Sequence, residues 1–356
     1  MQPAGDIHPQ ATYVFGVDIG GTKLATVLAT RGGEILHKVR LPTDAERGPE
    51  FGVARLISML RQNLDETGVD PEDIIGIGVA CGSPMDAERG IILGPPNLQS
   101  WNPVPIKEIL EAELALYTQL ENDANAGALA EWLFGAGRGK RNVVYMTMGT
   151  GIGGGLILDG RLYRGANGNA GEVGHMRVVR QGGPVCGCGK RGCLEAFCSG
   201  PAIARRTKEA LRRLPQGGAA TACVALAGEL EAVTAEHLFA AARQGDALAQ
   251  QLVDETAHYM GVGLANIIQA LNPEVIVLGT IATEQGDFFL DRVRRVVREE
   301  TWPQMSQVVE ILPSPLGKAV GDLGAISIIL QGLGAAAGDQ GHLPAASDQI
   351  CGREEP

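Results

Sequence analysis

One pattern occurs twice in the chain and constrains its fold more than any other. In residues 13–41, strand-forming runs at 13–18, 24–30 and 34–41 are separated by a Gly-Gly-Thr-Lys turn and a Gly-Gly turn. In residues 142–163, the runs 143–148, 156–158 and 161–163 are separated by a second glycine-rich turn and an Asp-Gly turn. Apolar runs punctuated by glycine turns are typical of consecutive antiparallel strands. The sequence therefore predicts two β-meanders related by a duplication.

The first turn of each meander carries groups that suit a phosphate. These residues are Gly20, Gly21, Thr22 and Lys23 in the first turn, and Gly149, Thr150 and Gly151 in the second. Glycines let backbone N–H groups approach an anion closely, and the hydroxyl and ammonium groups add donors. An ordinary glycine hairpin is the alternative. A strand follows each turn, which excludes a Walker loop and a dinucleotide-binding fingerprint, since both open a helix. We expect the two turns to hold the phosphates of one nucleotide between two lobes.

A cluster of metal-type ligands lies between these meanders and the C-terminal half. It consists of His175, Cys186, Cys188 and Cys193, so three of the seven cysteines fall within eight residues. Three thiolates and one imidazole suit a closed, tetrahedral zinc site, which is structural rather than catalytic. This clustering indicates a metal site in a reducing compartment rather than a disulfide framework, although free thiols are the alternative. The sequence predicts a structural Zn²⁺.

Two aspartates lie where strands end. Asp18 ends the first strand and suits a hydrated Mg²⁺, and Asp123 follows the run Leu120-Glu-Asn and suits a general base in phosphoryl transfer. Each has a structural alternative, because Asp18 could cap its turn and Asp123 could cap the helix expected at 124–134.

Several polar side chains next to glycine-rich loops suit a polyol, which needs many directional hydrogen bonds. These are Asn122, Asp123, Glu172, His175 and Glu195. If a metal takes one nitrogen of His175, the other becomes a donor directed toward the ligand.

Composition and charge narrow the class of protein. The chain has 41 acidic and 30 basic residues, a formal charge of −11, which argues against binding to nucleic acid or an anionic membrane. No apolar run is long enough to cross a bilayer, and the N-terminus lacks the features of a signal peptide. We therefore expect a cytoplasmic protein.

The remaining pattern is α/β. We expect helices at 49–66, 105–116, 124–134, 199–214, 234–244, 246–271, 287–299 and 321–332, and further strands at 74–80, 90–93, 274–278 and 308–312. Residues 1–10 and 335–356 are expected to be disordered.

With these residues in place, the chain resembles the ROK family of sugar kinases, and within it the ATP-dependent glucokinases, over roughly residues 13–333. The matching stretches are Asp18-x-Gly-Gly-Thr-Lys23, Pro96-Asn-Leu-x-x-Trp101, Glu121-Asn-Asp123, Gly149-Thr-Gly-x-Gly-Gly154, Glu172-Val-Gly-His175, Cys186-Gly-Cys-Gly-x-x-Gly-Cys-Leu-Glu195 and Leu271-x-Pro-Glu-Val-Ile-Val-Leu-Gly279. The cysteine motif followed by Glu195 is the most specific of them.

The resemblance implies a role for each matching residue. Asp123 is the base that deprotonates the 6-hydroxyl of the sugar. The sugar is bound by Ser83, Asn97, Asn122, Glu172, His175 and Glu195. The zinc is bound by His175, Cys186, Cys188 and Cys193. The phosphates and Mg²⁺ are surrounded by Asp18, Gly20, Gly21, Thr22, Lys23, Gly149, Thr150 and Gly151, with Gly279 near the adenosine. Ser83 occupies a position where the family often has glycine, so it can alter contacts with the sugar.

The resemblance also implies a fold and an activity. The expected fold is the duplicated, actin-like (ribonuclease H-like) α/β architecture, with two lobes around a cleft: a small lobe of residues 11–120 plus 318–334 and a large lobe of residues 121–317. The expected activity is ATP-dependent phosphorylation of glucose by a homodimer or homotetramer. Kinases for N-acetylmannosamine, N-acetylglucosamine or fructose are alternatives of the same class. A noncatalytic, sugar-sensing regulator is a further alternative, but only twelve residues precede the first expected strand, too few for a DNA-binding domain.

Overall fold

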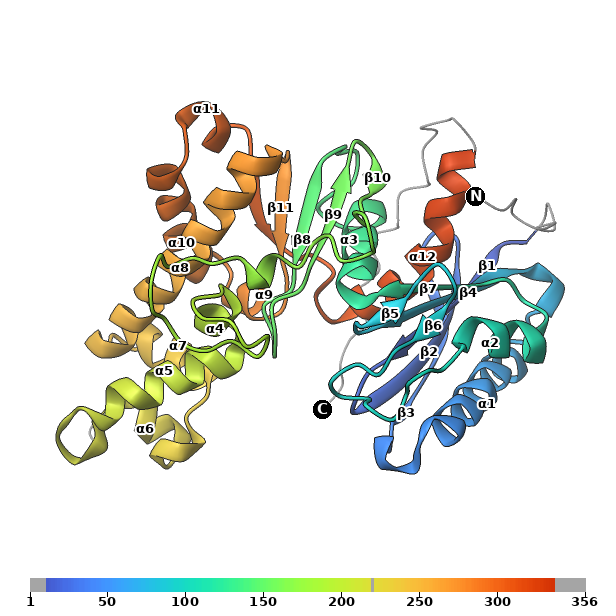
Figure 1. Cartoon of the computed structure of the whole chain (residues 1–356), viewed down its shortest axis with the longest axis horizontal. Coiled ribbons are helices and arrows are strands. Elements are labelled where there is room, and N and C mark those ends of the chain that lie inside the picture. The colour runs from blue at the N-terminus through green and yellow to red at the C-terminus, as the bar shows by residue number, and fades with distance from the viewer. Residues whose placement is uncertain (1–10, 219–220, 337–356) are drawn as a thin grey trace. The chain divides into compact units, whose positions relative to one another are not determined.

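The computed structural model describes residues 11–218 and 221–336 (Figure 1). The chain forms two compact units, and it passes between them after Phe134 and after Gly317. The expected boundary at 120/121 lies earlier than the first crossing. The helix that follows it, α3 (Asp123–Leu133), packs against the last helix, α12 (Val320–Ala336), and both belong to the first unit.

The first unit is built on a five-stranded sheet. Its strands are β1 (Tyr13–Ile19), β2 (Lys23–Thr30), β3 (Ile35–Pro42), β4 (Ile74–Cys81) and β7 (Thr118–Asn122). Their order is β3-β2-β1-β4-β7, in which β1, β2 and β3 are antiparallel neighbours and β4 and β7 continue parallel to β1.

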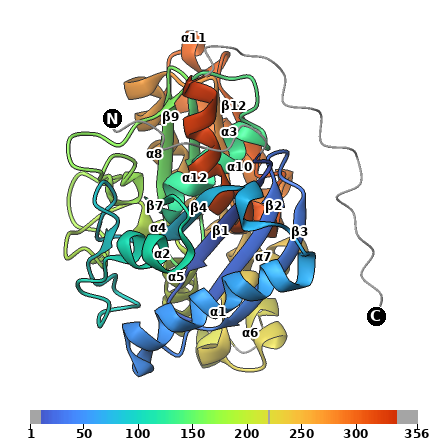
Figure 2. The same cartoon turned by 90° about the vertical axis from the view of Figure 1, so that its right-hand side faces the viewer.

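Alternation along β1 assigns its two faces. Phe15 and Val17 enter the core that α1 (Pro49–Thr67) and α2 (Ile106–Leu114) complete. Gly16, between them, faces α12 on the opposite side of the sheet, because successive side chains of a strand alternate. Figures 1 and 2 show α1 and α12 on opposite faces. Helix α12 approaches so closely that a Cβ at Gly78 of β4 would lie 1.9 Å from the carbonyl oxygen of Ala325.

The second unit repeats this topology. Its strands are β8 (Val143–Met146), β9 (Gly154–Leu158), β10 (Arg161–Leu162), β11 (Val275–Leu278) and β12 (Glu310–Pro313). Their order is β10-β9-β8-β11-β12, again an antiparallel meander followed by two strands parallel to its first. Helices α8 (Ala247–Leu271) and α10 (Asp287–Glu300) follow the third and fourth strands of the set, as α1 and α2 do in the first unit. The predicted duplication is confirmed.

Shorter elements complete the two units. The remaining helices are α4 (Glu195–Cys198), α5 (Gly200–Arg212), α6 (Ala222–Ala227), α7 (Ala235–Arg243), α9 (Ile281–Gln285) and α11 (Pro303–Ser306), and a small hairpin pairs β5 (Met85–Asp86) with β6 (Ile91–Ile92). Short 3₁₀ turns are η1 (Ala45–Arg47), η2 (Pro71–Asp73), η3 (Val173–His175), η4 (Pro215–Gly218), η5 (Leu230–Ala232) and η6 (Gly317–Ala319). The sequence did not predict β5, α4, α6, α9 or α11.

The last helix extends further than the sequence predicts. Helix α12 runs to Ala336, two residues into the C-terminal segment that was expected to be disordered. Residues 1–10 and 337–356 lie outside the described residues. Within the described part of the chain, no helix combines the length and the apolar character needed to span a membrane.

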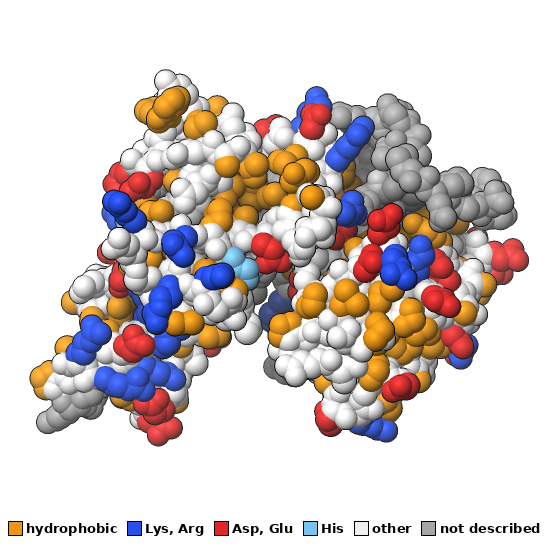
Figure 3. Space-filling view, in the orientation of Figure 1, with side chains coloured by type: hydrophobic (Ala, Val, Ile, Leu, Met, Phe, Trp, Pro, Cys, Tyr) orange, Lys and Arg blue, Asp and Glu red, His pale blue; other side chains and the backbone are white. Residues whose placement is uncertain are grey.

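Basic side chains gather around α5 on the face shown in Figure 3. Ion pairs balance three of them: Arg205 with Glu209, Arg206 with Glu255, and Arg212 with Glu231. Three of the basic side chains on this surface are therefore neutralised by acidic partners.

Candidate functional site

The first glycine turn is closed by its own backbone and held by β3. The N–H of Gly20 donates to the carbonyl of Lys23 at 3.0 Å. Thr43, just after β3, donates its hydroxyl to the carbonyl of Gly20 at 2.6 Å and its N–H to the carbonyl of Thr22 at 3.1 Å. The side chain of Thr22 is left exposed, where it can reach a ligand.

The same turn packs against the loop expected to bind sugar. A Cβ at Gly21 would lie 2.3 Å from the Cβ of Asn97 and 3.0 Å from its carbonyl oxygen. Only glycine therefore allows this approach. The structure thus brings together a residue assigned to phosphate and a residue assigned to sugar within the first unit.

Asp18 lies at the end of β1 in an acidic environment. Burial raises the pKa of its carboxyl group above the ordinary value of 3.8, Lys23 opposes this shift, and Asp123 and Asp322 add to it. Asp322 is itself paired with Lys38 at 2.5 Å. Among the described residues, the carboxylate of Asp18 makes no hydrogen bond to its turn, so the structure does not support the capping alternative. Asp18 is half-buried and available to a cation.

The structure shows which residue caps the N-terminus of α3. Asn122 is the N-cap residue, and its Oδ1 accepts from the N–H groups of Ala124 at 2.9 Å and Asn125 at 3.2 Å. The alternative in which Asp123 caps the helix is therefore wrong. Asn122 also donates its Nδ2 to the hydroxyl of Ser83 at 3.0 Å, so two residues assigned to sugar lie in contact.

Asp123 is the first residue of α3 and remains exposed. Its Oδ1 accepts from the N–H of Ala124 at 2.8 Å. Although part of its surface is open to solvent, protein surrounds the carboxyl group on most sides, and this desolvation raises its pKa above the ordinary value of 3.8. A carboxylate with a raised pKa is a stronger base than a free aspartate.

The second glycine turn is closed by a hydrogen bond from the N–H of Gly149 to the carbonyl of Gly151 at 3.0 Å. Thr280, just after β11, accepts from the N–H of Met148 at 3.0 Å and lies 3.0 Å from the hydroxyl of Thr147. Sequence reasoning missed Thr280 as a residue of this site. The signal available in the sequence was its position just after a buried strand. In the structure Thr280 adopts a positive φ of 54°, a backbone conformation that favours glycine.

Gly279 packs against the second sheet at the end of β11. A Cβ at this position would lie 2.7 Å from the hydroxyl oxygen of Tyr145 on β8. Packing within the second unit therefore explains the glycine without a nucleotide. Its expected place near adenosine stays a prediction.

The four metal-type side chains converge. Their ligand atoms all lie within 4.8 Å of one another. The Sγ atoms of Cys188 and Cys193 are 3.7 Å apart, and Nδ1 of His175 is 3.6 Å from Sγ of Cys186. Bond lengths of about 2.3 Å to sulfur and about 2.05 Å to nitrogen give tetrahedral S–S and S–N edges of about 3.8 Å and about 3.6 Å. The cluster therefore fits a tetrahedral zinc ion.

A small hairpin presents these ligands. Val185 bridges Arg191, the N–H of Cys186 donates to the carbonyl of Lys190 at 2.8 Å, and the N–H of Gly189 donates back to Cys186 at 2.9 Å. Gly189 has φ = 80°, a conformation that favours glycine. The local glycines thus allow the chain to turn around one centre.

His175 links this cluster to an exposed acid. Its Nδ1 points to Cys186, and its Nε2 lies 3.8 Å from Oε2 of Glu172. Both His175 and Glu172 are exposed. With a metal on Nδ1, the Nε2–H would be available to Glu172 or to a ligand hydroxyl between them.

Glu195 joins the cluster to the second glycine turn. Its Oε2 accepts from the N–H of Ile152 at 3.0 Å, and its Oε1 lies 3.4 Å from Sγ of Cys186. The sequence assigned Glu195 to the sugar alone. The structure gives both carboxylate oxygens partners within the second unit.

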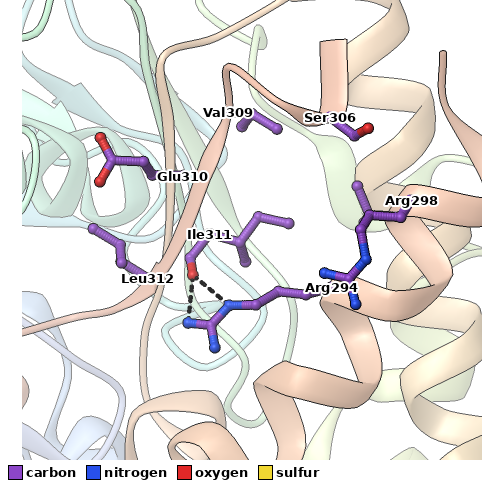
Figure 4. Close-up of a pocket in the computed structure, with 8 residues that line it drawn as sticks. Arg294, Arg298, Ser306, Val309, Glu310, Ile311 and Leu312 are labelled. Atoms are coloured by element: carbon purple, nitrogen blue, oxygen red, sulfur yellow. Dashed lines mark hydrogen bonds between the residues drawn. The ribbon is translucent and has the colours of Figure 1, made fainter. Parts of the chain in front are cut away.

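A separate cavity of about 290 Å³ lies beside β12 (Figure 4). Arg294 donates two hydrogen bonds to the carbonyl of Ile311 there, at 3.0 and 2.7 Å. None of the residues assigned to sugar, nucleotide or metal lines this cavity.

Comparisons with known proteins agree with this geometry. The sequence profile described as "ROK family" matches residues 14–332. A glucokinase from Thermotoga maritima is 36% identical over 321 residues, which cover 90% of this chain and 98% of that protein. The crystal structure of a ROK hexokinase from Thermus thermophilus is 35% identical, with a TM-score of 0.76 and coverage of 91% of this chain and 99% of that one. A ROK family glucokinase from Streptomyces griseus, in complex with glucose and AMPPNP, is 33% identical, with a TM-score of 0.73 and coverage of 89% and 98%. These structural similarities and the duplicated sheet order confirm the expected actin-like α/β fold, and the chain belongs to the ROK family.

Proposed function

We propose that the protein is an ATP-dependent hexokinase that phosphorylates the 6-hydroxyl of glucose. The glucokinase similarities support the reaction class and the substrates. The observation that carries the proposal is the state of Asp123, an exposed carboxylate with a raised pKa directly after β7, where Asn122 and not Asp123 is the N-cap residue of α3.

In the proposed reaction, Asp123 is the general base. Its carboxylate accepts the proton of the 6-hydroxyl while that oxygen attacks the γ-phosphorus of ATP. The bond between the γ-phosphorus and the bridging oxygen breaks, and ADP leaves with the bonding electron pair. The products are glucose 6-phosphate, ADP and a proton on Asp123, which then passes to solvent.

The two glycine turns serve the nucleotide in this proposal. Backbone N–H groups of the turns, with Thr22 and Lys23, bind phosphate oxygens. Asp18 would hold Mg²⁺, a fit supported by its half-buried carboxylate among other acids. When bound, Mg²⁺ supplies neutralisation of the phosphate charge.

The cysteine cluster is proposed to hold a structural Zn²⁺ through His175, Cys186, Cys188 and Cys193. Four protein ligands leave no open position, so the ion organises the loop rather than entering the chemistry. In this proposal His175 and Glu172 contribute hydrogen bonds to the hydroxyl groups of the sugar.

Substrate choice is proposed to depend on the hydroxyl and amide groups that converge in the first unit. The contact between Ser83 and Asn122 fixes one donor and leaves the hydroxyl hydrogen of Ser83 for another acceptor. Asn97, which packs on Gly21, is an exposed residue of the same unit. These groups can form hydrogen bonds whose geometry depends on the positions of the hydroxyl groups on a hexose.

A coupled ADP-release assay across a hexose panel tests this proposal. We expect glucose to give the highest kcat/KM among glucose, fructose, N-acetylglucosamine and N-acetylmannosamine, with ATP preferred to polyphosphate. Higher turnover with an N-acetylated hexose would change the substrate, and ADP release with none of them would reject the kinase.

The proposed setting is the cytoplasm, where ATP is abundant, and the proposed assembly is a homodimer or homotetramer. Light scattering at micromolar concentration gives the assembly directly. A mass equal to a single 37.3 kDa chain would reject the oligomer.

A further inference from the structure

We propose that Glu195 is a positioning residue that ties the second glycine turn to the Cys/His cluster, so that metal occupancy controls the order of the turn. The inference rests on contacts within the second unit. Its consequence for ATP rests on the proposed function, but its structural core does not.

The peptide unit of Ile152 is held from two directions. Its N–H donates to Oε2 of Glu195 at 3.0 Å. Its carbonyl oxygen packs against Gly174, where an added Cβ would lie only 2.1 Å away. Glu195 lies two residues after Cys193, and Gly174 lies one residue before His175. Both contacts that fix the peptide unit of Ile152 therefore come from residues within two positions of a metal-type ligand.

Gly151, in the turn, also lies close to the carboxylate of Glu195. A Cβ at Gly151 would lie 2.8 Å from Oε2 of Glu195. The φ of Gly151 is not in the left-handed region, so alanine fits its backbone and would act by displacing the carboxylate. Glycine at 151 thus serves the carboxylate as well as any phosphate.

The cluster itself has little apolar support. Cys186 and Cys193 pack with Ala196 in a small buried group apart from the main core of the second unit. A cross-link through the four ligand atoms would supply the rigidity that this group lacks. Since Glu195 lies only two residues after the ligand Cys193, loss of the cross-link would loosen its carboxylate together with the ligand hairpin.

Hydrogen exchange at the amide of Ile152 tests the link directly. In the metal-loaded protein we expect slow exchange, because the amide belongs to the buried residue Ile152 and donates to a carboxylate. Glu195→Ala should accelerate exchange at least about tenfold, the ratio expected when a charge-assisted hydrogen bond is lost. Glu195→Gln retains an acceptor and should restore part of the protection.

Gly151→Ala should accelerate exchange of the same amide while leaving Glu195 in the chain, which guards against a variant that fails to fold. Glu172→Gln is the matched control, because Glu172 is exposed and has no contact with Ile152 in the described structure; exchange at Ile152 should not change. Exchange in β11 should also stay constant, which excludes general loosening.

Chelation gives the decisive comparison. Removing metal from the wild-type protein should accelerate exchange at Ile152 and weaken ADP binding measured by calorimetry. The same treatment should change Glu195→Ala much less, since its link is already broken. Unchanged exchange in Glu195→Ala, or an equal effect of chelation on both proteins, would overturn the proposal. A turn that loosens while ADP binding is unaffected would instead reject the nucleotide role of the turn.

Discussion

Replacing Asn122 by alanine separates the cap of α3 from contacts with a sugar. The substitution removes the acceptor of two helix N–H groups, which costs about 1 kcal/mol, and the hydrogen bond to Ser83, which contributes about 1 kcal/mol more. We therefore expect the first unit to lose about 2 kcal/mol of unfolding free energy. For a unit of this size, thermal unfolding should shift down by about 4–8 °C.

Two matched variants separate the contribution of the helix cap from that of the hydrogen bond to Ser83. Asn122→Asp keeps an acceptor for both helix N–H groups but loses the amide donor, so it should be destabilised by only about 1 kcal/mol. Ser83→Ala removes the same hydrogen bond from the other side. Because both sides share one bond, the double variant Asn122→Ala/Ser83→Ala should be less destabilised than the sum of the single variants.

Calorimetric unfolding without ligands is the assay, since a sugar would add binding energy to the comparison. A transition of Asn122→Ala within 1 °C of wild type (~0.3 kcal/mol) would refute the capping role. Full additivity of Asn122→Ala and Ser83→Ala would refute the contact between them.

Three further outcomes follow from the structure. Metal analysis should find about one zinc per chain, and Cys193→Ser should lose it and unfold at lower temperature; full zinc content in that variant would contradict the ligand set. The kcat/KM should fall as the pH drops through the raised pKa of Asp123, because a base must be deprotonated, so the acid limb should lie above the ordinary value of 3.8; a limb at or below that value would contradict the assignment. Gly78→Ala should lose about 3 kcal/mol, since its Cβ would collide with the backbone carbonyl of Ala325 on α12; a stability equal to wild type by urea unfolding would mean that α12 does not pack there.

The duplicated architecture was predictable because it rests on local signals. Alternating apolar strands and paired glycines mark each β-meander, and the strand orders of the two sheets confirm their likeness. The longer helices also followed from periodicity, and α1 and α8 end within one residue of the expected positions.

Short elements were not predictable for a physical reason. Helix α6 lies in a Gly/Ala-rich segment and is fixed by Thr221 and by Asp246, which accepts the N–H of Ala222 at 3.0 Å. Ala222 and Asp246 are separated by more than twenty positions, so a short stretch of sequence around α6 does not reveal this hydrogen bond. Helices of this length depend on tertiary contacts rather than on propensity.

The site shows the same division. Spacing alone identified the four metal-type ligands, and their distances fit one ion. It did not distinguish Asn122 from Asp123 as the cap, because both types favour that position and differ by one residue. The bond from Ile152 to Glu195 spans 43 residues and depends on how a hairpin folds back on a turn. The contact of Thr280 with Met148, just before this turn, likewise joins residues far apart in the sequence and depends on the tertiary fold.

The raised pKa of Asp123 also has a consequence for stability. A carboxyl group whose pKa is higher in the folded than in the unfolded state destabilises the fold when it is ionised, so its cost appears as pH rises through both values. Asp123→Asn removes that cost and should be at least as stable as wild type at neutral pH. Loss of activity in this variant therefore cannot be ascribed to unfolding.

Phosphoryl transfer from ATP to glucose by Asp123→Asn, measured beside calorimetric binding of glucose, tests the proposed activity most directly. We predict that the wild-type protein forms glucose 6-phosphate, and that the variant loses about 10²–10⁴-fold in kcat, the usual contribution of a general base, while its affinity for glucose changes little. A variant that retains kcat within about tenfold of wild type would contradict Asp123 as the base. A wild-type protein that binds glucose but transfers no phosphate to it would contradict the kinase itself and favour a noncatalytic, sugar-sensing regulator.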